Sequence, residues 1–428
     1  MPVEVIQHSV TEVTLQLTVN LQGGLLEVEE RIQSVLNEAG CEVTALAIGG
    51  FDTDGSPIMT GDIKWTRRCR SPKTYQTPYG AVEVERDVYQ TSRGGKTYVP
   101  LEAAARIIRS STPLFAKQVT NKYARMNAAE VCADLWDNHG RQVSRGTLQL
   151  LADSVGGMAQ LKEESWQYES PRLDCAVKTV VCSLDGADLL EANDGWREAM
   201  VGTLSLYDVE GERQHTVYIG AAPEYGKGTF FQRYQQELSH LKALYPDALY
   251  LGIADGSSSN WAFLEQHTER QLLDYFHASE YLAGAAHAAY PQKTGKPQRQ
   301  QWLTERCHPL KHEEGAAQAI LTECQGFRNK RKLSRTVRED LEATITYFEN
   351  QGGRMGYAAH TRDHLPIGSG VTEAACKTLV KQRFCGAGMR WKDAGIKAVM
   401  SLRALVLTPG RWAQFWGKVQ QYGVPSLA

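Results

Sequence analysis

The spacing of apolar residues predicts strands and one helix in the first part of the chain. Residues 11–19, "TEVTLQLTV", alternate with the period of a strand, and residues 24–40, "GLLEVEERIQSVLNEAG", repeat with the period of a helix that ends at Gly40. Residues 79–102 alternate apolar and charged side chains and contain Gly94 and Gly95, which favours a β-hairpin that turns there. We therefore expect an α+β region over residues 1–112.

The pattern becomes helical between residues 113 and 165. One helix is expected over residues 127–138, then a break at Gly140 and a second helix with Ser144 as its N-cap. Two short helices joined by a tight turn fit a helix-turn-helix that binds DNA, although an ordinary helical hairpin gives the same pattern. The side chains expected to contact DNA lie at or beyond the turn and are Arg141, Arg145 and Gln149.

A run of β-branched residues near residue 175 begins a region with the pattern of a mixed sheet. Three consecutive strands are expected, the first of them ending at Asp185, and then a helix, a strand that leads to Asp255, a helix and a short strand over 271–276 that leads to His277. Such an order places helices on the faces of a mixed sheet. The expected fold class is thus α/β, with a mixed-sheet domain over residues 175–277 and 366–428.

A long, mostly helical and basic segment over residues 278–365 separates the two parts of this expected domain. It contains the basic run "RNKRKLSR" at 328–335, and insertions of this kind are tolerated at low cost in loops. The segment is either a decorative subdomain or a surface beside the acids that lines the path of bound DNA. In the second interpretation the DNA contacts include Arg328, Lys330, Arg331 and Lys332.

Three acids are expected to converge at one edge of the sheet. Asp185 and Asp255 each follow a strand, and Glu373 lies one turn into the helix predicted after the turn "LPIGSG". Asp255 alone is better explained as a turn or N-cap residue, and a second acid at a strand end and a third acid are needed to prefer a metal site. Three convergent carboxylates would repel one another without cations, so we expect two Mg²⁺ ions between them, with Mn²⁺ as a substitute. Rivals to Asp185 in and after the same turn are Asp188, Glu191 and Asp194.

Four stretches, "SLDGADL", "IADGSSSNW", "DYFHASEYL" and "LPIGSGVTEAACKTLVKQRFCGAGMRW", resemble the RNase H-like DDE transposases of bacterial insertion sequences, in particular the ISKra-type group and its relatives. The resemblance extends from about Phe115 to Trp416. It implies an RNase H-like catalytic domain with Asp185, Asp255 and Glu373 as its triad. Asp274 and His277 resemble the DxxH element of such families, which implies a place beside the site or on DNA. The zinc ribbon often found in relatives is not expected, because only Cys69 remains in that region.

Charge and composition change this interpretation only locally. The chain has 428 residues and a net charge of −2, and its nine cysteines include no CxxC pair, so neither disulfides nor a four-cysteine zinc site is expected. This use of cysteine favours the cytoplasm. No membrane span or export signal is visible in the sequence. Trp391, Trp412 and Trp416 are interpreted mainly as core anchors. Basic side chains that follow Glu373 are expected to hold phosphates, and they are Lys377, Lys381, Arg383 and Arg390.

The sequence therefore predicts a transposase that binds element ends in double-stranded DNA, nicks them to release a 3′-hydroxyl and transfers that strand to target DNA. A homo-oligomer on DNA is expected. Two alternatives remain open: a transposase-derived DNA-binding protein without catalysis, and a nuclease that acts on RNA or hybrid duplexes. The helix-turn-helix favours double-stranded DNA over the second of these.

Overall fold

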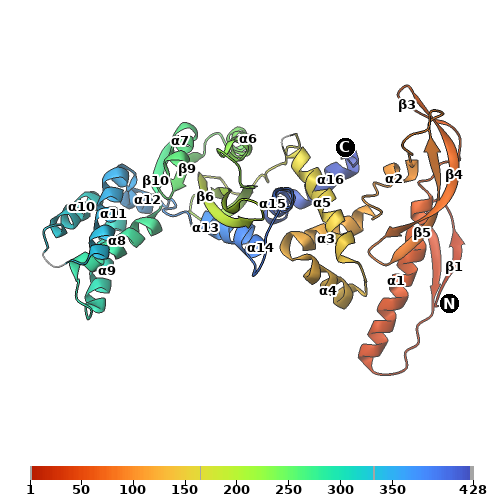
Figure 1. Cartoon of the computed structure of the whole chain (residues 1–428), viewed down its shortest axis with the longest axis horizontal. Coiled ribbons are helices and arrows are strands. Elements are labelled where there is room, and N and C mark those ends of the chain that lie inside the picture. Colours follow the sequence, from red (N-terminus) through yellow and green to blue (C-terminus); the bar gives the residue numbers. More distant parts are fainter. Residues whose placement is uncertain (1, 164, 331–332, 425–428) are drawn as a thin grey trace. The chain divides into compact units, whose positions relative to one another are not determined.

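The computed structural model describes residues 2–163, 165–330 and 333–424, and these form two compact units (Figure 1). The N-terminal unit comprises Met1–Glu169, Ala394–Val406 and Gly410–Ala428, and the sheet unit comprises Ser170–Asp393 and Leu407–Pro409. The expectation that residues 366–428 belong together with the sheet is thus wrong for the last two helices. These helices pack in the N-terminal unit, where the backbone of Ala398 in one of them lies against Gly156.

The N-terminal unit begins with two small antiparallel sheets beside one long helix. Its elements are β1 (Val3–His8), β2 (Val13–Leu17), α1 (Leu25–Gly49), β3 (Ile58–Thr60), β4 (Ile63–Gln76), β5 (Ala81–Gln90) and α2 (Pro100–Ala104). Helix α1 continues nine residues beyond the expected end at Gly40. The apolar pattern persists there, and Gly40 gives room to the ring of Tyr79, which a Cβ would overlap. Gly40 therefore serves close packing and does not end the helix.

The expected hairpin over residues 79–102 is only partly correct. Strand β5 pairs antiparallel with β4, from Thr66↔Gln90 to Gln76↔Ala81, so the basic sequence KWTRRCRSPK from Lys64 to Lys73 is part of a strand. Gly94 and Gly95 do turn the chain, both with positive φ, but a single bridge between Tyr89 and Tyr98 follows them. The alternating pattern of β5 predicted a strand correctly. Its partner, however, is β4 and not the residues that follow Gly95.

Helices complete the N-terminal unit. They are α3 (Pro113–Arg125), α4 (Ala128–His139), α5 (Arg145–Lys162), α15 (Asp393–Leu407) and α16 (Arg411–Tyr422). The expected starts of α4 and α5 are confirmed: Asn127 and Glu130 form a capping box, and Ser144 Oγ accepts a hydrogen bond from the Thr147 amide at 3.1 Å. Gly140 ends α4 in the left-handed conformation, at φ 59°.

A five-stranded mixed sheet forms the centre of the sheet unit. Its strands are β6 (Thr179–Glu191), β7 (Gly195–Tyr207), β8 (Arg213–Ala221), β9 (Leu249–Ala254) and β10 (Arg270–Leu273), in the order β10-β9-β6-β7-β8. β6, β7 and β8 are antiparallel neighbours, β9 is parallel to β6, and β10 is parallel to β9. Two expected ends are wrong. β6 does not end at Asp185, because its pairing with β7 extends to Glu191↔Gly195. The last strand, β10, ends at Leu273, before the predicted end at residue 276, and Tyr275 already belongs to helix α8.

Both faces of the sheet are covered (Figure 1). The helices are α6 (Gly228–Leu244), α7 (Ser258–His267), α13 (Gly370–Ala375) and α14 (Gln382–Phe384), with a π-helical segment, Cys376–Lys381, between the last two. On β7, Gly202 faces the rings of Tyr234 and Phe230 on α6, while Thr203 bonds to Thr372 on α13. Because adjacent strand residues point to opposite faces, α6 and α13 lie on opposite sides of the sheet.

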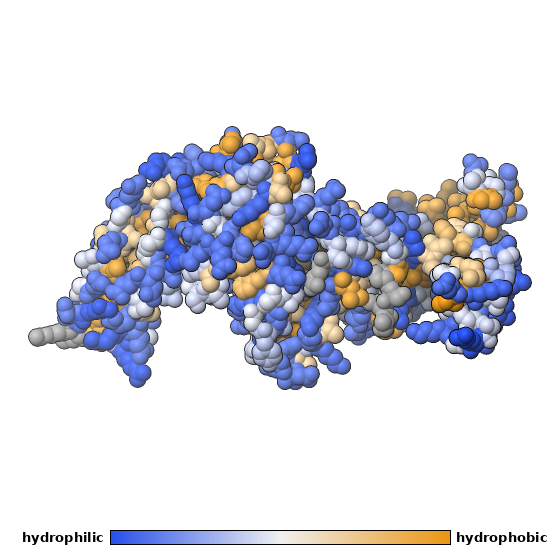
Figure 2. Space-filling view, turned by 90° about the horizontal axis from the view of Figure 1, so that it is seen from above, coloured by the Kyte–Doolittle hydropathy of each residue, from blue (hydrophilic) through white to orange (hydrophobic). Residues whose placement is uncertain are grey.

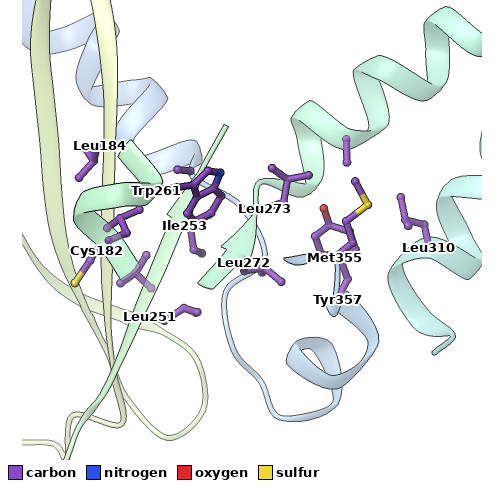
Figure 3. Packing of buried hydrophobic residues seen from close by; sticks show 14 of the residues in the cluster. Cys182, Leu184, Leu251, Ile253, Trp261, Leu272, Leu273, Leu310, Met355 and Tyr357 are labelled. Atoms are coloured by element: carbon purple, nitrogen blue, oxygen red, sulfur yellow. The ribbon is translucent and has the colours of Figure 1, made fainter. Parts of the chain in front are cut away.

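The segment between β10 and α13 is a helical layer, as expected. It contains α8 (Tyr275–Ala289), α9 (Lys296–His312), α10 (Ala316–Phe327), α11 (Arg335–Gln351), the 3₁₀ turn Gly352–Arg354 and α12 (Tyr357–Arg362). Figure 3 shows that Leu310 and Tyr357 of this layer extend the apolar cluster that contains Leu272 and Leu273 of β10. The insertion therefore shares one core with the sheet.

Among the described residues, no helix combines the length and apolar character needed to cross a membrane. Exposed apolar side chains nevertheless gather on the N-terminal unit, and Figure 2 shows apolar patches over it. They include Val5, Ile6, Leu17, Leu25 and Leu36 from β1, β2 and α1.

Candidate active site

Asp185 and Asp255 lie on neighbouring parallel strands. The β6–β9 register pairs Ser183 with Ile253, so each aspartate lies two residues further along its own strand direction. The strands run the same way, and the two carboxylates therefore reach the same edge of the sheet. Asp185 is still within β6, while Asp255 is the first residue after β9. The expected convergence of these two residues follows from the register.

The Asp185 carboxyl group is half-buried and strongly influenced by its surroundings. Its Oδ1 accepts a hydrogen bond from the Gly186 amide at 2.7 Å, and its Oδ2 accepts one from the Cys376 thiol at 3.5 Å. Burial raises the pKa of Asp185, and the nearby Asp255 charge raises it further, against the lowering effects of Gly186, Cys376 and His277. A negative charge here is thus destabilised by burial and by a second carboxylate.

The turn after β9 is held by the helical insertion. Asp255 Oδ1 accepts a hydrogen bond from the Ser257 amide at 3.2 Å, which is the turn role that its sequence alone suggested. Its backbone carbonyl accepts a 2.7 Å hydrogen bond from the Tyr347 hydroxyl on α11, and the Gly256 carbonyl accepts one from Gln351 at 3.3 Å. The expectation that the insertion packs next to the acids is confirmed for Asp255.

Glu373 is positioned through contacts made by its neighbours. The buried Thr372 hydroxyl lies 2.7 Å from the Thr203 hydroxyl of β7, which fixes α13 on the sheet. The fully buried Asp274 accepts hydrogen bonds from the Ser369 amide and hydroxyl at the start of α13. Glu373 itself is exposed, and its Oε1 lies 3.9 Å from His277 Nε2. Its place beside the sheet is therefore set by Thr372 and Ser369.

Electrostatics couple Glu373 to the same site. Burial raises its pKa, the charges of Asp274, Asp185 and Glu280 add to this, and His277 opposes it. Asp185 thus interacts with both Asp255 and Glu373. Among the described residues, however, no three His, Cys, Asp or Glu side chains are arranged as a metal-binding group.

The donor set still fits Mg²⁺ in its chemistry. Carboxylate oxygens are the ligands that this ion prefers, usually one or two per ion with waters completing the shell. Burial, and after it the neighbouring carboxylates, raise the pKa values of Asp185 and Glu373, and a bound cation would favour the charged form of both groups. Among the rivals, Asp188 points to the other face of β6 from Asp185, and Asp194 pairs with Arg197 at 3.1 Å.

The basic side chains after Glu373 divide into exposed and buried ones. Lys377, Lys381 and Arg390 are exposed, as a contact with phosphates requires. Arg383 is buried, with its guanidinium carbon 4.8 Å from the centre of the Trp391 ring. The expectation that Arg383 contacts DNA is corrected, because this side chain lies inside the sheet unit.

Two of the basic residues expected on the insertion surface have protein partners. Arg328 forms a two-pronged ion pair with Glu342, with its shortest contact at 2.7 Å. Lys330 donates to the Ala288 and Ala289 carbonyls at the end of α8, and burial lowers its pKa. Lys330 therefore has a structural role, whereas Arg328 remains exposed beside Glu342 and its expected DNA contact stays a prediction. Arg331 and Lys332 lie outside the described residues.

Of the residues expected to contact DNA near the α4–α5 turn, two are exposed and one is buried. Arg145 and Gln149 are exposed one turn apart at the start of α5. Arg141 is only 7% exposed and donates to the Thr77 carbonyl at 3.2 Å and to Gln76 Oε1 at 2.9 Å. The expected DNA contact of Arg141 is corrected, since its guanidinium ties the helices to the β4–β5 turn.

Sequence reasoning missed three residues that touch the site. Cys376 follows Glu373 by three positions, so helical spacing alone could have placed it on the same side. Tyr347 and Gln351 lie more than 90 residues from Asp255 and carry no local signal.

Trp416 is buried against Phe415, as expected of a core anchor.

The chain was also compared with known proteins. No family model matches it, and no curated protein is significantly similar to it.

Proposed function

We propose that this protein is a metal-dependent polynucleotidyl transferase, a transposase of the DDE type with an RNase H-like catalytic domain. One observation carries the proposal. Asp185 and Asp255 lie at one edge of the sheet on adjacent parallel strands, and Asp185 is electrostatically coupled to Glu373. A structural role for three partly exposed acids at one edge would be costly, because like charges repel.

The order of the elements supports the RNase H-like part of the proposal. Three antiparallel strands come first, and two further parallel strands, each reached through a helix, extend the sheet on the other side of β6. A helical insertion then separates β10 from the helix of Glu373. This is the arrangement that the resemblance to DDE transposases implies.

In the proposed reaction, Asp185, Asp255 and Glu373 would hold two Mg²⁺ ions. Bound ions at such a site activate the attacking oxygen and stabilise the leaving oxygen of a phosphodiester. Water attacks the phosphorus at the end of the element, the P–O3′ bond breaks, and a 3′-hydroxyl is released. That hydroxyl then attacks a phosphorus in target DNA, so one phosphodiester bond replaces another. His277, 3.9 Å from Glu373, would orient this carboxylate.

The partner in this proposal is double-stranded DNA, both element ends and target. Lys377, Lys381 and Arg390 are exposed on the segment that follows Glu373, where they could bind phosphates. Arg145 and Gln149 at the start of α5 would read the element end. Joining two element ends to one target requires more than one copy of the chain, so a homo-oligomer on DNA is part of the proposal.

The test is cleavage of duplex oligonucleotides whose sequences are taken from the DNA that flanks the gene and screened for inverted repeats. Asp185→Asn, Asp255→Asn and Glu373→Gln should each reduce nicking in Mg²⁺ or Mn²⁺ by more than about a hundredfold and leave DNA binding intact. Asp188→Asn is the matched control, because this exposed carboxylate lies on the same strand and the opposite face. It should nick like the unchanged protein.

Near-normal nicking by any of the three variants would remove that residue from the site. Specific binding without nicking in any divalent metal would favour the DNA-binding protein without catalysis. Cleavage of RNA or hybrid duplexes in preference to DNA would favour the nuclease.

A further inference from the structure

The N-terminal unit contains a cavity that none of the proposed chemistry uses. It has a volume of about 670 Å³ and lies between one face of the β4–β5 ribbon, helix α2 and the end of α16. This volume is in the range of ordinary ligand sites. The polar side chains that matter for its chemistry are Ser71, Lys73, Arg86, Thr97, Glu102 and Arg106.

Positive charge exceeds negative charge in this lining. Glu102 is the carboxylate among these six side chains, and it accepts hydrogen bonds from Lys73 Nζ at 3.0 Å and from the Tyr75 hydroxyl at 2.9 Å. Arg106 donates to the carbonyls of Ala103 and Gln420, which are neutral acceptors. Among these six side chains the three cations Lys73, Arg86 and Arg106 thus outnumber the single carboxylate, and the cavity favours an anion.

Arg86 provides the most specific signal. It is paired with Ser71 across the two strands, so both side chains lie on the cavity face of the ribbon. Its side chain is 13% exposed, and its Nε lies 3.6 Å from Glu102, beyond hydrogen-bond distance. Within the part of the chain that the structure describes, neither Nε nor Nη1 of Arg86 has a hydrogen-bond acceptor. Buried donors without an acceptor are costly, and a ligand that brings one offsets the cost.

We propose that this cavity binds a phosphate group. The guanidinium of Arg86 can present two parallel N–H donors through Nη2 and one of its other nitrogens, which is the geometry that suits a phosphate oxygen pair, and Ser71 and Thr97 provide hydroxyl donors. Lys73 and Arg106 supply the charge for a dianion or a backbone phosphate. The phosphate belongs either to a small phosphate ester or to the DNA backbone. The inference does not depend on cleavage by the sheet unit.

Thermal unfolding of the full-length chain tests the site directly. Sodium phosphate should raise the Tm of the unchanged protein more than sodium chloride at equal ionic strength does. Arg86→Met should lose this difference, while its Tm in chloride stays the same or rises, because a buried charge without a full set of partners is gone. Arg93→Met is the matched control, since Arg93 is exposed on the same unit outside the cavity, and it should respond like the unchanged protein.

Arg86→Lys keeps the positive charge but cannot donate two parallel hydrogen bonds. It should therefore weaken phosphate binding, followed by the increase in Tm, at least about tenfold. This variant also decides the question if Arg86→Met fails to fold. An equal phosphate response in Arg86→Lys and the unchanged protein would overturn the proposal, as would no response in the unchanged protein.

Binding of a 20-base-pair duplex, followed by fluorescence anisotropy, identifies the source of the phosphate. A loss of duplex affinity of about tenfold in Arg86→Lys, with competition by free phosphate, assigns the cavity to the DNA backbone. Unchanged duplex affinity together with a phosphate-dependent Tm assigns it to a small phosphate ester. If neither probe distinguishes Arg86→Lys from the unchanged protein, the proposal is wrong.

Discussion

Asp274 shows how one buried carboxylate can set the position of another residue. Its Oδ1 accepts hydrogen bonds from the Phe276 and His277 amides and so caps α8, and its Oδ2 accepts both Ser369 donors. It therefore joins the end of β10 to the start of the Glu373 helix. Full burial excludes the DNA contact that the sequence left open for it. Asp274 is a positioning residue for Glu373.

Asp274→Asn should reduce both stability and cleavage. An amide can present only one oxygen, so its NH₂ group would face either the Ser369 donors or the cap of α8. We expect a loss of about 1.5–3 kcal/mol in the free energy of unfolding and a decrease in cleavage of about tenfold or more, with DNA binding unchanged. Urea unfolding and nicking assays well below the Tm measure the two effects.

Ser334→Ala, which removes the N-cap of α11, is the control for stability alone. It should cost about 1 kcal/mol and leave nicking unchanged. If both variants nick equally fast, Asp274 does not position Glu373.

At the scale of elements, α11 acts on the site through the turn after β9. Tyr347→Phe removes the hydroxyl that donates to the Asp255 carbonyl. We expect a loss of about 1 kcal/mol in stability and a decrease in nicking of up to about tenfold, because the Asp255 turn becomes less fixed. Tyr281→Phe is the matched control, since it keeps the stacked ring pair and the Tyr347 hydroxyl. Equal nicking by both variants would mean that α11 packs beside the site without affecting it.

The start of α5 makes a second prediction at this scale. Arg145 and Gln149 are exposed on one side of the helix, so Arg145→Ala should cost about 1–3 kcal/mol in binding to element ends and relax sequence preference. Anisotropy titrations with end-containing and scrambled duplexes measure both quantities. Arg125→Ala, an exposed arginine at the end of α3, should leave the preference unchanged. An equal loss on every duplex would indicate a phosphate contact, and no loss would leave an ordinary helical hairpin.

The sequence predicted elements better than their ends and partners. Caps identified the starts of α4 and α5, because Asn127 and Ser144 act on amides within three residues. The end of β6 was misplaced, because Asp185 resembles a strand end until the antiparallel pairing with β7 is known. The roles of Arg86 in the cavity and of Tyr347 at the Asp255 turn depend on contacts with residues far away in the sequence. The periodicity of apolar residues carries no information about such contacts.

For the whole molecule, the structure reduces the number of basic residues available to DNA. Arg141 and Arg383 are buried, Arg328 is paired with Glu342, and Lys330 caps α8. A count of basic runs along the sequence therefore overestimates the positive surface. Lys377 and Lys381 remain exposed beside Glu373, which makes them the better test of a phosphate-binding surface.

Neutralising these two lysines should change the salt dependence of DNA binding. Each phosphate contact contributes roughly 0.9 to the slope of log K against log salt concentration, so Lys377→Gln with Lys381→Gln should flatten the slope by about 1.8. The loss should be similar for all duplex sequences, because phosphates carry no sequence information. Arg328→Gln with Lys330→Gln removes the same charge from the insertion and should flatten the slope far less, since both side chains already have protein partners. Anisotropy titrations over a series of salt concentrations compare the two double variants. A larger change for the insertion pair would mean that DNA follows the surface of α10 and α11 and displaces these partners.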